Sequence, residues 1–119
     1  MESSRQHAGM AVERAYRFVL WLTPTVEKFP RAQKHLLGDR LQGLALDVLE
    51  DLIEATYSRA RLPILQRANL RLEKLRFLVR MAKDLRHLDL RRYEHAAEEI
   101  NAVGRLVGGW LKACHAPTP

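Results

Sequence analysis

Apolar residues recur every three or four positions along most of this 119-residue chain, which is the spacing that places side chains on one face of an α-helix. One such run has intervals of four, three, four, four and three residues: Leu37, Leu41, Leu44, Val48, Leu52 and Ala55. No stretch has the strict alternation that is typical of a half-buried strand. The sequence therefore predicts an all-α protein.

Three prolines and one aspartate divide this pattern into four segments, because proline interrupts or starts a helix and aspartate caps one. Pro24 and Pro30 separate the first two segments, Pro63 begins the third, and Asp89 precedes the fourth. Short links between long helices favour antiparallel neighbours, so the predicted fold is an antiparallel four-helix bundle. We expect its helices at residues 8–22, 30–58, 63–88 and 90–112.

The predicted bundle domain spans residues 8–112, with a disordered N-terminus at 1–7 and a frayed tail at 113–119. Helical spacing places Tyr16 on the inward face of the first helix, and it places Trp110 outside the inward face of the last one.

Several classes of protein are disfavoured by what the sequence lacks. Its single cysteine, Cys114, cannot form an internal disulfide and fits a reducing compartment. The first residues carry no apolar run typical of a secretory signal, and no apolar stretch approaches the roughly 20 residues that cross a bilayer. We therefore expect a cytoplasmic protein.

Signs of catalysis are also missing. The chain has no glycine-rich phosphate loop and no Cys-x-x-Cys pair. A di-iron bundle would need Glu-x-x-His on two helices, and the nearest pattern is a single one, Asp84-x-x-His87. We expect no enzyme activity, no cofactor and no metal site.

Positive charge is concentrated in one part of the chain. The whole sequence has 20 Lys and Arg against 14 Asp and Glu, for a formal net charge of +6. Residues 59–92 hold eleven of the bases and three of the acids, so this stretch carries +8 and the remainder −2. Arginine and lysine at helical spacing suit phosphate groups. The candidate nucleic-acid contacts are Arg67, Arg71, Lys74, Arg76, Arg80, Lys83 and Arg86.

Three other interpretations of these charges stay open. The second predicted helix has an acidic face, which could pair with the basic helix of another subunit: Asp39, Asp47, Glu50, Asp51 and Glu54. The basic helix could equally dock on an acidic partner protein, or both faces could simply be solvated.

The third predicted helix has a second apolar strip, separate from its core face. A helix of a four-helix monomer needs only one apolar face. The second strip is therefore a candidate subunit interface, unless the helix is central and buries both strips within the chain. Its residues are Leu70, Phe77, Met81 and Leu88.

A set of short motifs runs through the chain in a fixed order. An aromatic group (Tyr16, Phe18, Leu20, Trp21) is followed by Lys28-Phe29-Pro30-Arg31, Leu37-Gly38-x-Arg40-Leu41, Ala55-x-Tyr57, Leu75-Arg76-x-Leu78, Arg80-x-Ala82 and Gly104-Arg105-x-x-Gly108-Gly109-Trp110-Leu111-Lys112. This series resembles the accessory variability determinant (Avd) proteins of diversity-generating retroelements, within the group of four-helix bundles that includes the 23S rRNA intervening-sequence proteins.

The resemblance implies a non-catalytic protein of a prokaryote or a phage-infected prokaryote that assembles into a barrel-like homopentamer. It would bind the retroelement's reverse transcriptase, and RNA or DNA through phosphate contacts, to support mutagenic retrohoming. The alternative within the same group is a structural adaptor of the intervening-sequence type that binds an acidic protein.

Overall fold

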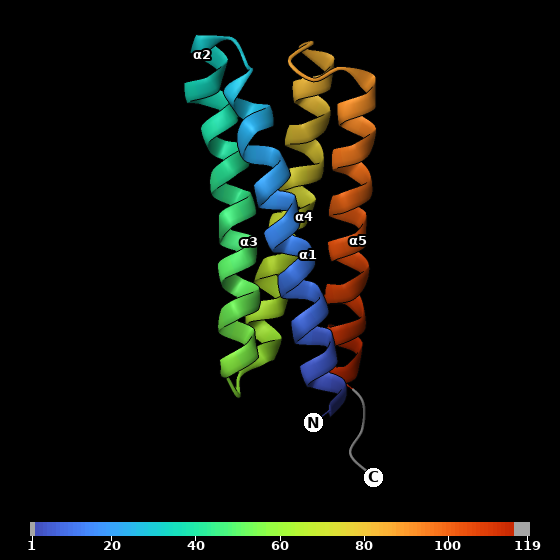
Figure 1. Ribbon diagram of the computed structural model, residues 1–119. Coiled ribbons are helices and arrows are strands. Elements are labelled where there is room, and N and C mark those ends of the chain that lie inside the picture. The colour runs from blue at the N-terminus through green and yellow to red at the C-terminus, as the bar shows by residue number, and fades with distance from the viewer. Residues whose placement is uncertain (1, 116–119) are drawn as a thin grey trace.

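The computed structural model describes residues 2–115, and they form four long helical rods (Figure 1). The elements are α1 (Glu2–Glu27), α2 (Arg31–Gln33), the π-helical turn η1 (Lys34–Gly38), α3 (Asp39–Tyr57), α4 (Arg61–Asp84) and α5 (Leu90–His115). The backbone keeps helical dihedral angles through the junctions at Lys34 and Gly38, so α2, η1 and α3 form one continuous rod. No strand occurs within residues 2–115, which confirms the all-α prediction.

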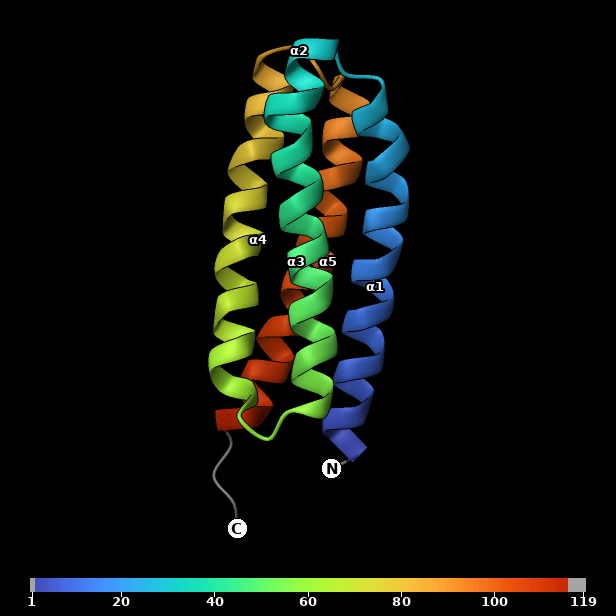
Figure 2. The same cartoon turned by 90° about the vertical axis from the view of Figure 1, so that its left-hand side faces the viewer.

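Each long helix packs against two antiparallel neighbours. α1 contacts α3 and α5, while α4 contacts α3 and α5, so α1 lies diagonally opposite α4 (Figures 1 and 2). The molecule measures 53 × 21 × 19 Å. The helical ends near both termini lie at one end of the bundle, and α2 lies at the other (Figure 1). None of the helices in the described part of the chain is long and apolar enough to span a membrane.

α1 is longer at both ends than the sequence predicted. Residues 2–7 are helical, so the predicted disorder at 1–7 is wrong for these six residues, while residue 1 lies outside the described part. At the other end the helix continues through Pro24 to Glu27. The hydroxyls of Thr23 and Thr25 donate hydrogen bonds to the carbonyls of Val19 and Trp21, at 3.0 and 2.9 Å. Because Pro24 has no N–H, the carbonyl of Leu20 has no helical donor. The two threonine hydroxyls bond to the carbonyls on either side of it.

α4 ends at Asp84, four residues before the predicted boundary. Arg86 has a left-handed backbone with φ of 67°. The N–H groups of His87 and Arg86 donate to the carbonyls of Ala82 and Lys83, at 2.8 and 2.9 Å. This pair of bonds is a Schellman motif, which stops a helix and turns the chain back. The turn carries Leu88 into the core, where it is 3% exposed.

α5 begins where the sequence predicted. Asp89 Oδ1 accepts a hydrogen bond from the backbone N–H of Arg92 at 2.8 Å, so Asp89 is the N-cap. This bond, together with the charge of the Arg92 side chain, holds the pKa of the Asp89 carboxyl below its usual value. The helix runs to His115, three residues into the predicted tail; residues 116–119 of that tail lie outside the described part.

The core confirms most of the predicted inward faces and corrects two positions. Tyr16 is exposed, because the buried face of α1 is turned toward Phe18 and Val26. Trp110 is fully buried and packs inside the bundle. It lies near the end of α5 and is fully shielded from solvent.

Candidate nucleic-acid interface

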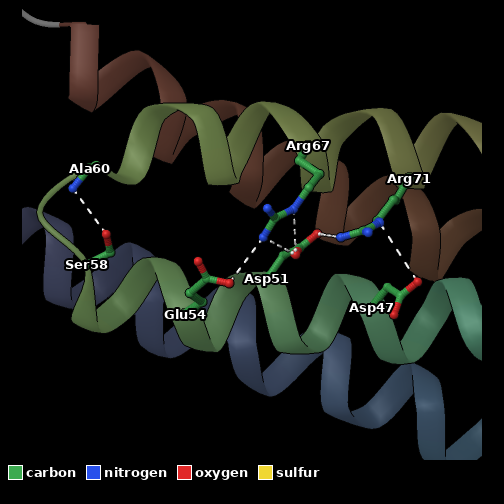
Figure 3. Close-up of polar contacts among 7 residues, drawn as sticks. All are labelled: Asp47, Asp51, Glu54, Ser58, Ala60, Arg67 and Arg71. Atoms are coloured by element: carbon green, nitrogen blue, oxygen red, sulfur yellow. Dashed lines mark hydrogen bonds and ion pairs between the residues drawn. The ribbon is translucent and has the colours of Figure 1, made fainter.

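The candidate nucleic-acid contacts form a basic ladder along α4, and its first two members, Arg67 and Arg71, are paired with acids at the seam between α3 and α4 (Figure 3). Asp51 lies on α3 with its side chain only 4% exposed. Arg67 Nε and Nη2 donate to Asp51 Oδ1 at 3.0 and 2.8 Å, and Arg71 Nη1 donates to Asp51 Oδ2 at 2.6 Å. Glu54 lies 3.1 Å from Arg67 Nη2, and Asp47 lies 3.9 Å from Arg71 Nε.

This network pairs two of the eleven basic residues in 59–92 with acids of α3. The hydrogen bonds and charge of Asp51 raise the pKa of the Arg67 guanidinium further above its already high value. The acidic face of α3 therefore meets the basic helix of its own chain, whereas the sequence left open a meeting between two subunits. Arg67 and Arg71 are first of all links between α3 and α4.

The other members of the ladder fall into two groups. Arg76 and Lys83 contact α5, whereas Lys74, Arg80 and Arg86 are exposed to solvent. Arg76 Nε donates to Asn101 Oδ1 at 3.1 Å, and its guanidinium also pairs with Glu73 and lies over Gly104, where a Cβ would meet it. Lys83 Nζ lies 4.6 Å from the centroid of the Tyr93 ring. Both side chains therefore contact α5 and do not extend freely into solvent.

Three of the predicted residues keep their charged groups available. Arg80 is exposed and approaches an acid only at 3.9 Å, at Asp84. Lys74 and Arg86 are exposed and have no ion pair among the described residues. These three, on α4 and in the turn after it, are the members of the predicted set that could contact phosphate without breaking an existing bond.

The predicted interface strip is largely present. Leu70, Phe77 and Met81 are 56%, 65% and 49% exposed, and we call these three residues the α4 strip. Leu88 does not belong to it, because the turn at Arg86 buries this side chain in the core. A second group of exposed apolar residues, the α1–α3 patch, lies on two other helices: Tyr16, Leu20, Leu46 and Ile53.

A groove between α1 and α5 was not predicted. Arginines of both helices line it, beside Trp21 and His95. The sequence holds a partial signal, since Arg14, Arg17 and Trp21 follow one another at intervals of three and four residues. The residues contributed by α5 are about 80 positions away, so only the packing of the helices brings the two sets together.

Among the side chains that the structure describes, no three His, Cys, Asp or Glu residues are arranged to hold a metal ion. A model of the bAvd-like family matches residues 9–114, which cover the bundle almost entirely. No curated protein matches the sequence.

Proposed function

Because the chain belongs to the bAvd-like family, we propose that it is a non-catalytic accessory protein of a diversity-generating retroelement. The family match over residues 9–114 carries this proposal, and it agrees with the resemblance to Avd proteins seen in the motifs. The protein would bind the reverse transcriptase of the retroelement together with template RNA or cDNA.

The exposed bases support the nucleic-acid part of this proposal. Lys74, Arg80 and Arg86 project from α4 and the turn that follows it, and they are not held by close ion pairs in the described structure. Each can approach a phosphate without breaking an internal bond. Such contacts recognise the backbone of RNA or DNA and do not read its sequence.

Two separate apolar surfaces support assembly into a homo-oligomer. The α4 strip and the α1–α3 patch lie on different helices, so neither needs to pair with itself. When one surface of a subunit docks on a different surface of the next, the contact is head-to-tail and can close into a ring. We therefore propose a ring-shaped homo-oligomer, and the homopentamer implied by the Avd resemblance is the expected closed form.

A binding experiment tests the nucleic-acid role. The wild type and a Lys74→Gln/Arg80→Gln/Arg86→Gln variant are titrated with labelled RNA at several salt concentrations. We expect weaker binding by the variant, with the log–log salt slope reduced by about 0.7 to 0.9 for each phosphate that the variant no longer neutralises. An Arg5→Gln/Arg59→Gln/Lys112→Gln variant removes the same charge at the opposite end of the bundle and is the matched control.

The outcomes separate the two candidate functions. No RNA or DNA binding by the wild type at micromolar protein would favour the intervening-sequence type of adaptor, which binds an acidic protein. Equally weakened binding in both triple variants would mean that net charge, and not this surface, drives binding. Co-purification of the wild type with the reverse transcriptase encoded beside it tests the protein partner directly.

A further inference from the structure

Three adjoining surface hollows follow the seam between α1 and α5. The first, of about 330 Å³, is lined by Arg17 and Arg105 among others, and the second, of about 260 Å³, by Arg14, Arg17 and His95. The third, of about 370 Å³, is lined by Trp21 and His95. Because Arg14 and Arg17 border the first two hollows and His95 borders the last two, the three form one continuous groove.

Arginine is the dominant charged residue of this groove. Five arginines line it, against three acids: Glu13, Asp89 and Glu99. Within the described residues, Arg91 and Arg105 have no ion pair, and Arg14 reaches Glu99 only at 3.5 Å. Arg17 pairs with Glu13 at 3.2 Å, but both side chains are more than half exposed, where such pairs contribute little. Arg92 pairs with Asp89 at 2.7 Å, whereas the guanidinium groups of Arg17, Arg91 and Arg105 can turn toward an anionic ligand at small cost.

An aromatic wall borders the third hollow. The rings of Trp21 and His95 lie 4.7 Å apart between centroids and are tilted by 48°. The Trp21 indole also packs against Phe18, with the ring centroids 6.2 Å apart and an interplanar angle of 22°. Phe18 is buried, so the indole is held in a fixed position at the edge of the groove. Arg91 and Arg92 line the same hollow, beside this wall.

We propose that the α1–α5 groove binds single-stranded nucleic acid, with phosphates on its arginines and an unpaired base against Trp21 and His95. The proposal rests on the nucleic-acid role proposed above and adds a second site and a substrate class to it. Proteins commonly bind single strands through a groove that combines basic side chains, which contact the phosphates, with aromatic side chains, on which the unpaired bases stack. In a duplex each base is paired and covered by its neighbours, so duplex would engage only the arginines.

The length and location of the groove fit this ligand. The stretch of α5 that lines it runs from Arg91 to Leu106, which spans about 23 Å at 1.5 Å per residue. A strand of several nucleotides could follow it. The groove lies on the side of the bundle opposite the α3–α4 face (Figures 1 and 2).

Intrinsic fluorescence tests the proposal on the full chain. The protein has two tryptophans: Trp110 is fully buried and gives a constant background, while Trp21 borders the groove. Addition of a 12-nucleotide oligo-U should quench Trp21, and a duplex RNA of the same length should quench it much less. In parallel, anisotropy with labelled forms of the two RNAs gives both affinities.

Four variants separate stacking from charge. Trp21→Leu and His95→Ala should each lower the affinity for oligo-U roughly five- to hundredfold, the range for removal of one stacked base, with the salt slope unchanged. Arg17→Gln/Arg105→Gln should weaken oligo-U binding and flatten its salt slope by about 0.7 for each arginine that faces a phosphate. Arg59→Gln/Lys112→Gln removes equal charge outside the groove, from two exposed residues, and it should keep the Trp21 quenching and the single-strand preference. His95 is exposed, so His95→Ala remains informative if Trp21→Leu fails to fold.

The results that would overturn the groove proposal differ from those that would overturn the nucleic-acid role. If the wild type binds RNA but oligo-U neither quenches Trp21 nor is preferred over duplex, the groove proposal is overturned while the nucleic-acid role stands. If the wild type binds no RNA at all, both fail. If poly-glutamate of equal charge quenches Trp21 and displaces oligo-U at the same concentration, the groove takes acidic protein segments and the proposal is also overturned.

Discussion

Arg67 on α4 donates two hydrogen bonds to a single carboxylate oxygen of Asp51 on α3, at 3.0 and 2.8 Å. This link joins the most basic helix of the protein to its most acidic one within the same chain. A charge excess that looks like a ligand-binding surface in the sequence is therefore partly a device that holds two helices together.

Replacement of Asp51 by asparagine should destabilise the fold by about 2 kcal/mol. Removing one partner of a buried ion pair costs about 3 to 5 kcal/mol, and the cost here is lower because the arginines can reach water. Urea unfolding measures the change. The neighbouring Glu50 is exposed, so Glu50→Gln should alter stability by less than about 0.5 kcal/mol. Equal stability of the two variants would show that the Asp51 network contributes nothing.

Replacement of Phe77 by aspartate should break the oligomer. A charge at the centre of the α4 strip would have to be buried in any contact made there, and that is unfavourable without a partner. Light scattering should give a mass near 13.8 kDa for the variant and a larger mass for the wild type. Leu36 is equally exposed but lies on η1 at the end of the bundle, so Leu36→Asp should leave the assembly intact. A monomeric wild type would contradict the assembly proposal.

Replacement of Arg86 by glycine should stabilise the protein by about 0.5 to 1 kcal/mol. A residue with a Cβ is strained at φ of 67°, and glycine is not, although glycine also gains freedom in the unfolded state. Thermal or urea unfolding measures this difference. Arg86→Ala removes the same charge but keeps the Cβ, and it should not stabilise. This pair of variants separates the role of Arg86 in the turn from its proposed contact with phosphate.

Replacement of Gly38 by alanine should destabilise the bundle by about 1 to 2 kcal/mol. A Cβ at Gly38 would lie 2.5 Å from Val26 Cγ1, and Val26 is a buried β-branched side chain with little room to move. Gly43 on the same rod has no atom within 4 Å of such a Cβ. Gly43→Ala should instead stabilise by about 0.5 to 1 kcal/mol, through helix propensity. If both variants gain stability in urea unfolding, η1 does not pack closely on α1.

The cap at Asp89 should make stability depend on pH in the acid range. Its pKa is lower in the folded protein than in the unfolded chain, so its contribution is present above about pH 4. The contribution is lost as the pH falls through the folded value. Asp89→Ala should therefore be less stable than the wild type at pH 7, with the gap closing below about pH 4. Asp89→Asn can still cap the helix, and it should lie between the two at pH 7; thermal unfolding across pH 3–7 checks the order.

The sequence was a good guide where the signal is local. The core face of α4 follows an apolar repeat that is continuous in the sequence: Ile64, Ala68, Leu72, Leu75, Val79 and Ala82. The start of α5 was also correct, because an N-cap depends on a side chain and a backbone N–H three residues away. The family was identified correctly from motifs that keep their order and spacing.

Other features depend on contacts between distant parts of the chain. Helical spacing alone allows more than one inward face for α1, and packing against α3 and α5 chose the face with Phe18 over the one with Tyr16. α4 ends where Arg86 adopts a left-handed backbone conformation. Burial of Leu88 in the core helps to stabilise this turn, and the sequence near Arg86 does not reveal that burial.

The sequence by itself determined that the protein is a bundle of long helices with its positive charge gathered on one of them. Only the tertiary structure decided which of those charges remain available. Helical periodicity is a property of neighbouring residues, whereas neutralisation of Arg67 and Arg71 by Asp51, and the meeting of Arg14 and Arg17 with Arg105, require helices far apart in the chain to pack side by side.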